Sequence, residues 1–440
     1  MGLAIFMFLI LVFITFINYL INGKEYISPS VIFSAGFAFS SFWLVIFAKK
    51  WNLYLGFNTF FVIVFGNIIF SVVCKVINEI YKKRKRFSDG NNGFENKNLK
   101  EIIIDKYKIN VFLIFSIIIN ILTLYYTVKA VNGSFSNIGN ALYAYRNITA
   151  YKGESLNIPG YIEILSGVLH ASFYWFLYVF INNMLVKKKI SLKILIIIIL
   201  SAISSVLDGS RGAIINSILA IIPIFYFLKI KKNGYKSNLK LKNVLLIICL
   251  LVILISTLKW TATALGRNDI NEIKTIDYIA MYTGAEIKNL DTYLSEKKMI
   301  ETNIGIHTFR TIYESLSKYA NKKWEMDIVA LYRNVNGYNL GNVYTIFFDF
   351  VCDLGYIGIL IFTPIMAIIS QILYEKSKNS IVNNNHLPIS VIMYSFAFGG
   401  IVFAFFGNKF FPQVISFGFV KYIILWYLYN WFFCKIKIKY

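Results

Sequence analysis

Apolar runs of membrane-spanning length recur along the whole of this 440-residue chain. A helix needs about 20 apolar residues to cross the hydrocarbon core, whereas a transmembrane strand needs only about 10 alternating ones. These runs have the helical length, and we therefore predict an all-α, polytopic integral membrane helix bundle. Eleven spans are expected, near residues 3–21, 28–48, 53–75, 109–130, 159–184, 191–207, 213–230, 243–260, 345–373, 387–407 and 414–434.

The composition excludes a soluble protein with a single membrane anchor. Hydrophobic residues make up 57% of the chain and charged residues 15%, against about 45–50% and 25% in soluble domains. Because the apolar runs extend from end to end, residues 1–440 are expected to form a single polytopic membrane domain. The run at 345–373 exceeds one span, which indicates a tilted helix or a helix with an interfacial lead-in.

Basic clusters predict how the spans are oriented. They follow the third, fifth, seventh, ninth and eleventh spans, at 82–86, 187–189, 229–242, 376–378 and 435–439. Eleven spans place all five clusters on one side, which the positive-inside rule identifies as the cytoplasm. We expect a multi-pass protein of the cytoplasmic membrane with its N-terminus outside and its C-terminus inside. The first span lacks the flanks of a cleaved signal and is expected to be retained.

The net charge of +23 follows from this topology. Basic cytoplasmic loops face anionic membrane lipid, so lipid is an expected partner and nucleic acid is not. The four cysteines lie in or beside apolar runs, without the spacing of a metal site or a disulfide framework.

Two of the three longest loops differ in composition. Residues 76–108 are basic and rich in Asn and Gly, and we predict a flexible cytoplasmic connector there. Residues 131–158 form an external loop with aromatic and basic side chains, among them Tyr143, Arg146 and Lys152. This mixture is compatible with a sugar-phosphate ligand or with an interfacial aromatic belt.

The third loop, 261–340, is external and too long to be structureless. Apolar residues at i, i+3 and i+7 predict two amphipathic helices in it, which lie on the membrane surface or at the mouth of the bundle. The two sets are Ile287, Leu290 and Leu294, and Ile312, Leu316 and Tyr319.

A short charged turn joins two apolar runs at "LDGSRGA", with Asp208, Ser210 and Arg211 between the spans. Gly209 and Gly212 permit a tight reversal and the close approach of another group to the backbone. The guanidinium of Arg211 matches phosphate oxygens at the external boundary. The alternative is a plain hairpin in which Arg211 reaches lipid head groups or pairs with Asp208.

Four segments together resemble the Wzy-type O-antigen and capsular polysaccharide polymerases. They are "GSRGAII" (209–215), "YTGAEIKNLDTYL" (282–294), "GIHTFRTIY" (305–313) and "GNVYTIFFDFVCDLGYIGIL" (341–360). The last segment also resembles the related O-antigen ligases at Asn342, Tyr344 and the "DLGYIG" that starts at Asp353. Gly341 occupies the place of the ligase histidine, and this departure favours a polymerase.

The resemblance implies polymerisation of lipid-linked oligosaccharide repeat units at the outer face of the cytoplasmic membrane. The growing glycan moves from undecaprenyl pyrophosphate to a hydroxyl of the next repeat unit. A chain-length regulator and a flippase of the same pathway are implied partners. The departing pyrophosphate requires fixed positive charge and the attacking hydroxyl a base. The external loops contain no Asp-x-Asp motif, so metal-independent chemistry without a cofactor is expected.

The resemblance and the residue types together select the candidate site residues. Catalytic candidates are Arg211 and Arg310 for the pyrophosphate and His307, Glu286 and Asp353 for proton transfer. Candidates for substrate binding are Ser210, Arg267, Lys288, Asn289, Asn342, Tyr344 and Asp349. The alternative for Arg310 is the solvated face of a surface helix, and for each acid a structural hydrogen bond.

Two other functions remain open from the sequence. One is a glycolipid flippase or exporter without catalysis, and the other is a ligase-like glycosyltransferase. A transporter typically has symmetric halves and short external loops. This chain instead concentrates its external polar residues in one late loop, which favours an enzyme at the outer face.

Overall fold

A computed structural model of the chain describes most of its residues. These are 1–88, 99–151, 156, 158–187, 190–207, 211–233, 263, 273–296, 300–320, 322–380 and 387–435, with the backbone alone at 85–88, 150, 151, 211 and 435. The chain folds into two compact units. The first unit comprises Met1–Glu95, Ile276–Lys378 and Ala397–Phe419, and the second comprises Asn96–Thr275, Asn379–Phe396 and Val420–Tyr440.

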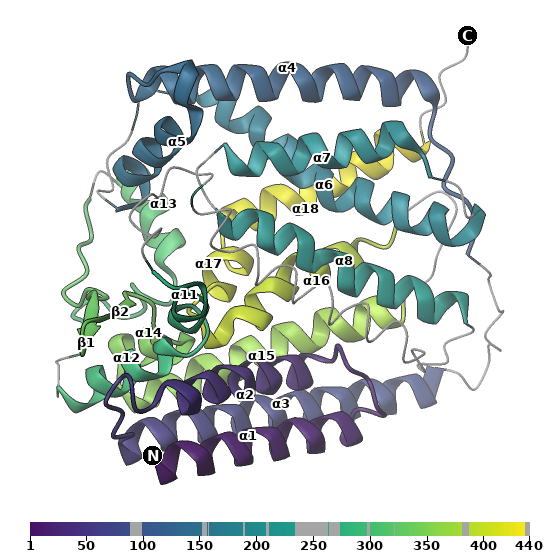
Figure 1. Cartoon of the computed structure of the whole chain (residues 1–440). Helices are drawn as coiled ribbons and strands as arrows, with labels where there is room; N and C mark the ends of the chain where they lie inside the picture. Colours follow the sequence, from purple (N-terminus) through teal and green to yellow (C-terminus); the bar gives the residue numbers. More distant parts are fainter. Residues whose placement is uncertain are drawn as a thin grey trace. The chain divides into compact units, whose positions relative to one another are not determined.

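The predicted all-α class is confirmed. Seven described helices, α1, α2, α3, α4, α6, α8 and α15, are long and apolar enough to cross a membrane, and α7 and α16 are shorter apolar helices. The protein is therefore a multi-pass membrane protein. The helices and strands, shown in Figure 1, are α1 (Gly2–Ile21), α2 (Pro29–Phe47), α3 (Phe57–Ser88), α4 (Lys106–Ala130), α5 (Ile138–Arg146), α6 (Gly160–Lys187), α7 (Leu192–Val206), α8 (Arg211–Lys232), α11 (Thr275–Met281), α12 (Ala285–Ser295), α13 (Arg310–Ala320), β1 (Arg333–Val335), β2 (Tyr338–Gly341), α14 (Ile346–Leu354), α15 (Tyr356–Lys378), α16 (Ile389–Val402), α17 (Phe410–Val414) and α18 (Phe417–Tyr429).

Ten of the eleven expected spans coincide with described helices, and the span near 243–260 lies outside the described residues. The prediction of a flexible connector from residue 76 is wrong for its first part, because α3 continues to Ser88. Glu79 supports this extension by pairing with Lys75 at 3.5 Å and with Lys82 at 3.0 Å. Such pairs, one helical turn apart, favour helix in a polar segment. The loop at 131–158 is also partly helical, since α5 lies within it.

The run at 345–373 is two helices, α14 and α15, separated by Gly355. Gly355 has φ 61° and ψ −150°, a region of backbone space that is essentially restricted to glycine. A Cβ on Gly358 would lie 2.0 Å from the carbonyl oxygen of Phe350. A side chain at Gly358 would therefore push α15 away from the end of α14.

Buried amides and hydroxyls join the first three helices of the first unit. Asn18 Nδ2 donates to the carbonyl of Ser30 and to the hydroxyls of Ser34 and Ser71. Asn22 accepts a hydrogen bond from Asn78 at 3.2 Å. Such contacts hold helices together where lipid removes the hydrophobic drive for association. Figure 1 shows α1, α2, α3 and α15 as neighbouring helices, and α15 packs against both α2 and α3.

The layer formed by α1, α2, α3 and α15 makes different contacts at its two ends. At one end, Glu25 of the α1–α2 connection accepts hydrogen bonds from Tyr374 and Lys378, near the end of α15. At the other end, Lys50 of the α2–α3 connection pairs with Asp277 of α11 at 2.9 Å. This arrangement brings the segment that begins at residue 275 to the end of the layer where α2 ends and α3 begins.

The second unit is built around α6. Serine pairs join α6 to α7, with Ser166 to Ser204 at 3.1 Å and Ser172 to Ser201 at 2.9 Å. Small polar residues let helix backbones approach closely in a membrane. Trp175 Nε1 donates to Asn430 Oδ1 at 2.9 Å and so fixes the residues that follow α18.

Candidate active site

The segment 276–354 of the first unit contains all the candidate residues whose side chains the structure describes. The helices predicted in it are confirmed as α12 and α13. They differ in environment, because α12 is largely buried whereas α13 has no buried residue. The predicted apolar face of α13 remains open, with Leu316 40% and Tyr319 85% exposed.

Helix α12 has a buried face and a face that lines a pocket, here called its polar face. Glu286, Asn289, Leu290 and Tyr293, at i, i+3, i+4 and i+7, are all buried. Lys288, Asp291, Thr292 and Ser295 recur with the same spacing and line an open pocket. The two stripes lie on opposite sides of one helix, which separates them by about its diameter of 10–12 Å.

The buried face of α12 attaches this helix to the chain before α14. Asn289 Nδ2 donates to the carbonyls of Leu340 and Val343, at 3.1 and 2.8 Å. The ring of Tyr293 packs edge-on against Phe348 of α14, with centroids 4.8 Å apart. Asn289, a candidate for substrate binding, is thus fully buried, and its donors are engaged by the backbone.

Glu286 is fully buried on the same face. Neither of its carboxylate oxygens has a hydrogen-bond partner among the described residues. Burial raises the pKa of the Glu286 carboxyl well above its ordinary value. The proton-transfer role predicted for Glu286 would require access from a substrate, because both carboxylate oxygens are buried.

His307 lies at the centre of three carboxylates. Its Nε2 is 2.9 Å from Glu301 Oε1, and its Nδ1 is 3.8 Å from Asp349 Oδ1. The carboxylate of Asp353 accepts the backbone N–H groups of His307 and Thr308, at 3.0 and 2.8 Å. Asp349 and Asp353 share one face of α14, as their four-residue spacing predicts. This face meets the turn that precedes α13.

Glu301, which organises the cluster, was not among the residues selected from the sequence. Its carboxylate accepts the backbone N–H groups of Asp327 and Ile328, both at 2.9 Å, in addition to its contact with His307. Its own N–H donates to the carbonyl of Cys352 at 2.9 Å. The one local feature of the sequence that could have identified Glu301 is its position six residues before His307, because its other partners are more distant along the chain.

The cluster favours the charged form of His307. Burial by itself lowers the pKa of the imidazole, but the carboxylates of Asp349, Glu301 and Asp353 outweigh it and raise the pKa above its ordinary value. The three carboxylates differ in what they can do. Glu301 and Asp353 are buried and bound to backbone N–H groups, whereas the Asp349 side chain is 22% exposed. Asp349 is therefore the carboxylate of this cluster that is open to a ligand.

Arg310 does not share a helix with His307, because α13 begins at Arg310 and His307 lies in the preceding turn. Their three-residue spacing would place both side chains on one helix face only if a single helix contained them. Arg310 Nε donates to Glu314 Oε1 at 2.7 Å, and the Arg310 side chain is 53% exposed. This exposed i, i+4 pair matches the solvated-face alternative and leaves most of the guanidinium accessible.

The remaining candidates lie near the antiparallel pair of strands β1 and β2 or outside the described side chains. The Tyr344 hydroxyl accepts from Arg333 Nε at 3.2 Å and donates to the carbonyl of Leu331 at 3.0 Å. Asn342 is half-buried just before it. Arg211 is the first residue of α8, where the backbone alone is described, and Ser210 and Arg267 lie outside the described residues.

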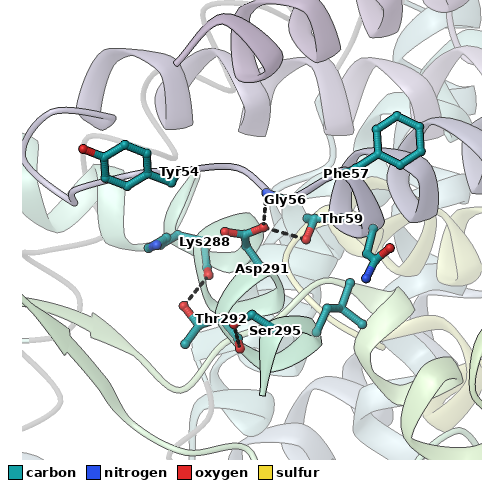
Figure 2. A pocket seen from close by; sticks show the side chains of 10 residues that line it. Tyr54, Gly56, Phe57, Thr59, Lys288, Asp291, Thr292 and Ser295 are labelled. Atoms are coloured by element: carbon teal, nitrogen blue, oxygen red, sulfur yellow. Dashed lines mark hydrogen bonds between the residues drawn. The ribbon is translucent and has the colours of Figure 1, made fainter. Parts of the chain in front are cut away.

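Figure 2 shows the pocket on the polar face of α12, which has a volume of about 440 Å³. Asp291 Oδ1 accepts the N–H of Gly56 at 2.8 Å and the hydroxyl of Thr59 at 2.7 Å, so it joins α12 to the first turn of α3. Lys288, a candidate for substrate binding, lines this pocket. Within the described ranges, no group of three or more His, Cys, Asp and Glu side chains is arranged to hold a metal ion.

Comparison with known proteins gave no match to a protein-family model, to a curated protein or to a solved structure. A function for this chain therefore has to be inferred from its sequence segments, its membrane fold and the geometry of this site.

Proposed function

We propose that this protein polymerises lipid-linked oligosaccharide repeat units into a surface polysaccharide at the outer face of the cytoplasmic membrane. The growing glycan moves from undecaprenyl pyrophosphate to a hydroxyl of the next lipid-linked unit. A multi-pass bundle is suitable for this reaction, because both substrates carry polyprenyl tails that remain in the bilayer.

One observation carries the proposal: three of the four sequence segments that resemble the polymerases meet in the first unit. Asn289 of 282–294 holds the backbone of Leu340 and Val343, where the segment 341–360 begins. Asp353 of that last segment in turn binds the backbone of His307, which belongs to 305–313. Segments that form one site in the folded chain are expected to converge in this way.

The roles of the residues around His307 follow from their exposure and hydrogen bonding. Asp349 is the proposed general base, because it is partly exposed and its carboxylate lies beside His307. The ring of His307 positions Asp349, while Glu301 and Asp353 hold the surrounding backbone. Arg211 and Arg310 are the proposed partners of the pyrophosphate, since a guanidinium presents a fork of donors to phosphate oxygens.

The proposed step balances as a substitution at the anomeric carbon. The bond from this carbon to the pyrophosphate oxygen breaks, and undecaprenyl pyrophosphate leaves with the bonding electrons. The acceptor hydroxyl oxygen forms the new glycosidic bond and passes its proton to Asp349. Fixed positive charge stabilises the departing pyrophosphate.

The test uses a strain that lacks this gene and receives wild-type, Asp349→Asn, Arg211→Ala or Glu314→Gln copies. We expect a surface-glycan ladder with wild type and Glu314→Gln, and single repeat units in the deletion strain. Loss of a general base lowers a rate by about 10²–10⁴-fold, so Asp349→Asn should nearly abolish the ladder at equal protein level. Arg211→Ala should also collapse it.

Two results contradict the proposal. A ladder that persists in the deletion strain shows that another protein makes the polymer. Lipid-linked units that accumulate inside the cell, with none outside, indicate transport rather than polymerisation.

A further inference from the structure

The pocket on the polar face of α12 is separate from the carboxylate cluster around His307. One wall is the stripe of Lys288, Asp291, Thr292 and Ser295, and the other is the chain that enters α3. Its volume of about 440 Å³ lies within the range of about 300–1,000 Å³ that is typical of sites for small ligands.

The two walls are fixed to each other by Asp291. Its side chain spans the junction and accepts from Gly56 and Thr59 of the α3 wall. Thr292 and Ser295 donate their hydroxyl protons to backbone carbonyls of α12, at 3.1 and 2.7 Å. Their oxygens therefore remain acceptors for a ligand.

The charge of the pocket argues against a strongly anionic ligand. Lys288 and Asp291 are the two ionisable side chains of opposite sign in the lining. A phosphate or pyrophosphate site typically gathers several cations or an arginine fork. The lining instead offers one ammonium group, the Asn58 amide and hydroxyl oxygens, which match a neutral ligand rich in hydroxyl groups.

Two largely exposed aromatic residues line the same pocket. Tyr54 is 79% exposed and Phe57 is 69% exposed, and both line it. A pyranose ring has an apolar C–H face and polar edges, so it packs against an aromatic face while its hydroxyl groups bond to neighbouring polar atoms. The pocket offers both kinds of partner, because exposed aromatic rings lie beside hydrogen-bond acceptors and an ammonium group.

We propose that the pocket formed by Tyr54, Phe57 and the polar face of α12 binds a saccharide, with a sugar ring packed on Tyr54. The inference deepens the proposed function and rests on it, since it adds a holding site for the glycan outside the reacting centre. Retention of the glycan between transfers would favour long chains over short ones.

The experiment compares surface-glycan ladders in the deletion strain carrying wild-type, Tyr54→Ala, Tyr54→Phe or Tyr319→Ala copies, with the protein level measured in membranes. Loss of one ring contact should lower the yield of long chains by roughly three- to tenfold in Tyr54→Ala. Tyr54→Phe keeps the ring and should match wild type. Tyr319 is a matched control, because it is exposed but lies outside the pocket.

A second measurement detects binding without turnover. The full-length protein in lipid nanodiscs is mixed with saccharide fragments that mild acid releases from the strain's own surface glycan. Saturation of aromatic protons should transfer to the sugar C–H protons with wild type and Tyr54→Phe, and transfer should fall with Tyr54→Ala.

The outcomes separate the two proposals. Unchanged long chains and unchanged saturation transfer in Tyr54→Ala overturn the saccharide pocket while polymerisation stands. If Tyr54→Ala loses glycan only in proportion to a loss of protein from the membrane, Tyr54 serves membrane anchoring. That result also overturns the saccharide pocket. A ladder that persists in the deletion strain contradicts the polymerase itself.

Discussion

The ionisable residues around His307 show how hydrogen bonding divides roles among chemically similar side chains. Asp349 and Asp353 lie one turn apart on α14, yet Asp353 accepts two backbone N–H groups and Asp349 lies against the imidazole. Asp353 therefore acts as a structural acceptor that shapes the turn before α13. This geometry favours the structural alternative for Asp353 and leaves Asp349 as the better candidate base.

We predict that Asp353→Ala destabilises the protein. It leaves two buried N–H groups without an acceptor, and each such group costs about 1–3 kcal/mol. Thermal unfolding in detergent, followed by tryptophan fluorescence, measures the loss. Glu314→Ala removes an exposed pair and should change the free energy of unfolding by less than about 1 kcal/mol. Equal stability of the two variants would contradict the assignment.

His307 predicts a pH dependence whose sign follows from its raised pKa. A group with a higher pKa in the folded state stabilises the fold fully below its unfolded pKa, about 6.5. That contribution is lost as pH rises through the folded pKa. The stability advantage of wild type over His307→Gln should therefore be largest near pH 5.5 and shrink towards pH 9. Thermal midpoints of both proteins across this range test it, and an advantage that grows with pH would refute it.

At the scale of elements, the glycines around α14 and α15 determine how one apolar run becomes two packed helices. Gly355 supplies a backbone conformation that other residues rarely adopt, and Gly358 allows the Phe350 carbonyl to approach α15. The break places Asp349 and Asp353 on a short helix beside the turn at His307. A single continuous helix over 345–373 would lack the break at Gly355 and the packing of α14 against α15.

We therefore predict that Gly358→Ala is strongly destabilising. Its Cβ would overlap the Phe350 backbone, and forced repacking of this kind costs about 1–3 kcal/mol or more. Gly167→Ala in α6 is the matched control, since its Cβ would meet nothing within 4 Å. This control should be neutral or stabilising by up to about 1 kcal/mol. Thermal midpoints in detergent compare the two, and a Gly358→Ala protein as stable as wild type would disprove the close approach.

At the scale of the molecule, the contacts of the first unit agree with the alternation expected from the basic clusters. The α1–α2 connection meets the end of α15 through Glu25 and Lys378, and the α2–α3 connection meets α11 through Lys50 and Asp277. Helix α2 lies between Glu25 and Lys50, and helix α15 lies between Asp277 and Lys378. If each of these helices crosses the membrane once, the two sets of contacts lie on opposite sides of it. Which set faces the cytoplasm is predicted from the positive-inside rule.

Cysteine labelling tests that orientation. In a cysteine-free background, Lys323→Cys should react with a membrane-impermeant maleimide in spheroplasts, because residue 323 is exposed on the proposed outer side. Lys83→Cys, exposed near the end of α3, should react only after permeabilisation. The reverse pattern would invert the topology and remove the cluster around His307 from the outer face.

The patterns that could be interpreted locally were predicted well. Apolar length identified the membrane helices, and i, i+3, i+7 spacing identified α12 and α13. The same spacing did not distinguish their environments, because burial of α12 depends on partners that are distant in sequence. Glu301 was missed for this reason, since its carboxylate binds residues 26 and 27 positions away.

The sequence by itself determined that this protein is a helical membrane bundle, because in lipid the backbone must satisfy its own hydrogen bonds and about 20 apolar residues are enough to enforce a helix. Only the tertiary structure decided which ionisable residues are available for chemistry. Asp353 and Asn289 are engaged by backbone groups, whereas Asp349 and Lys288 remain open to ligands. That difference depends on contacts between distant segments, and residue type alone does not encode it.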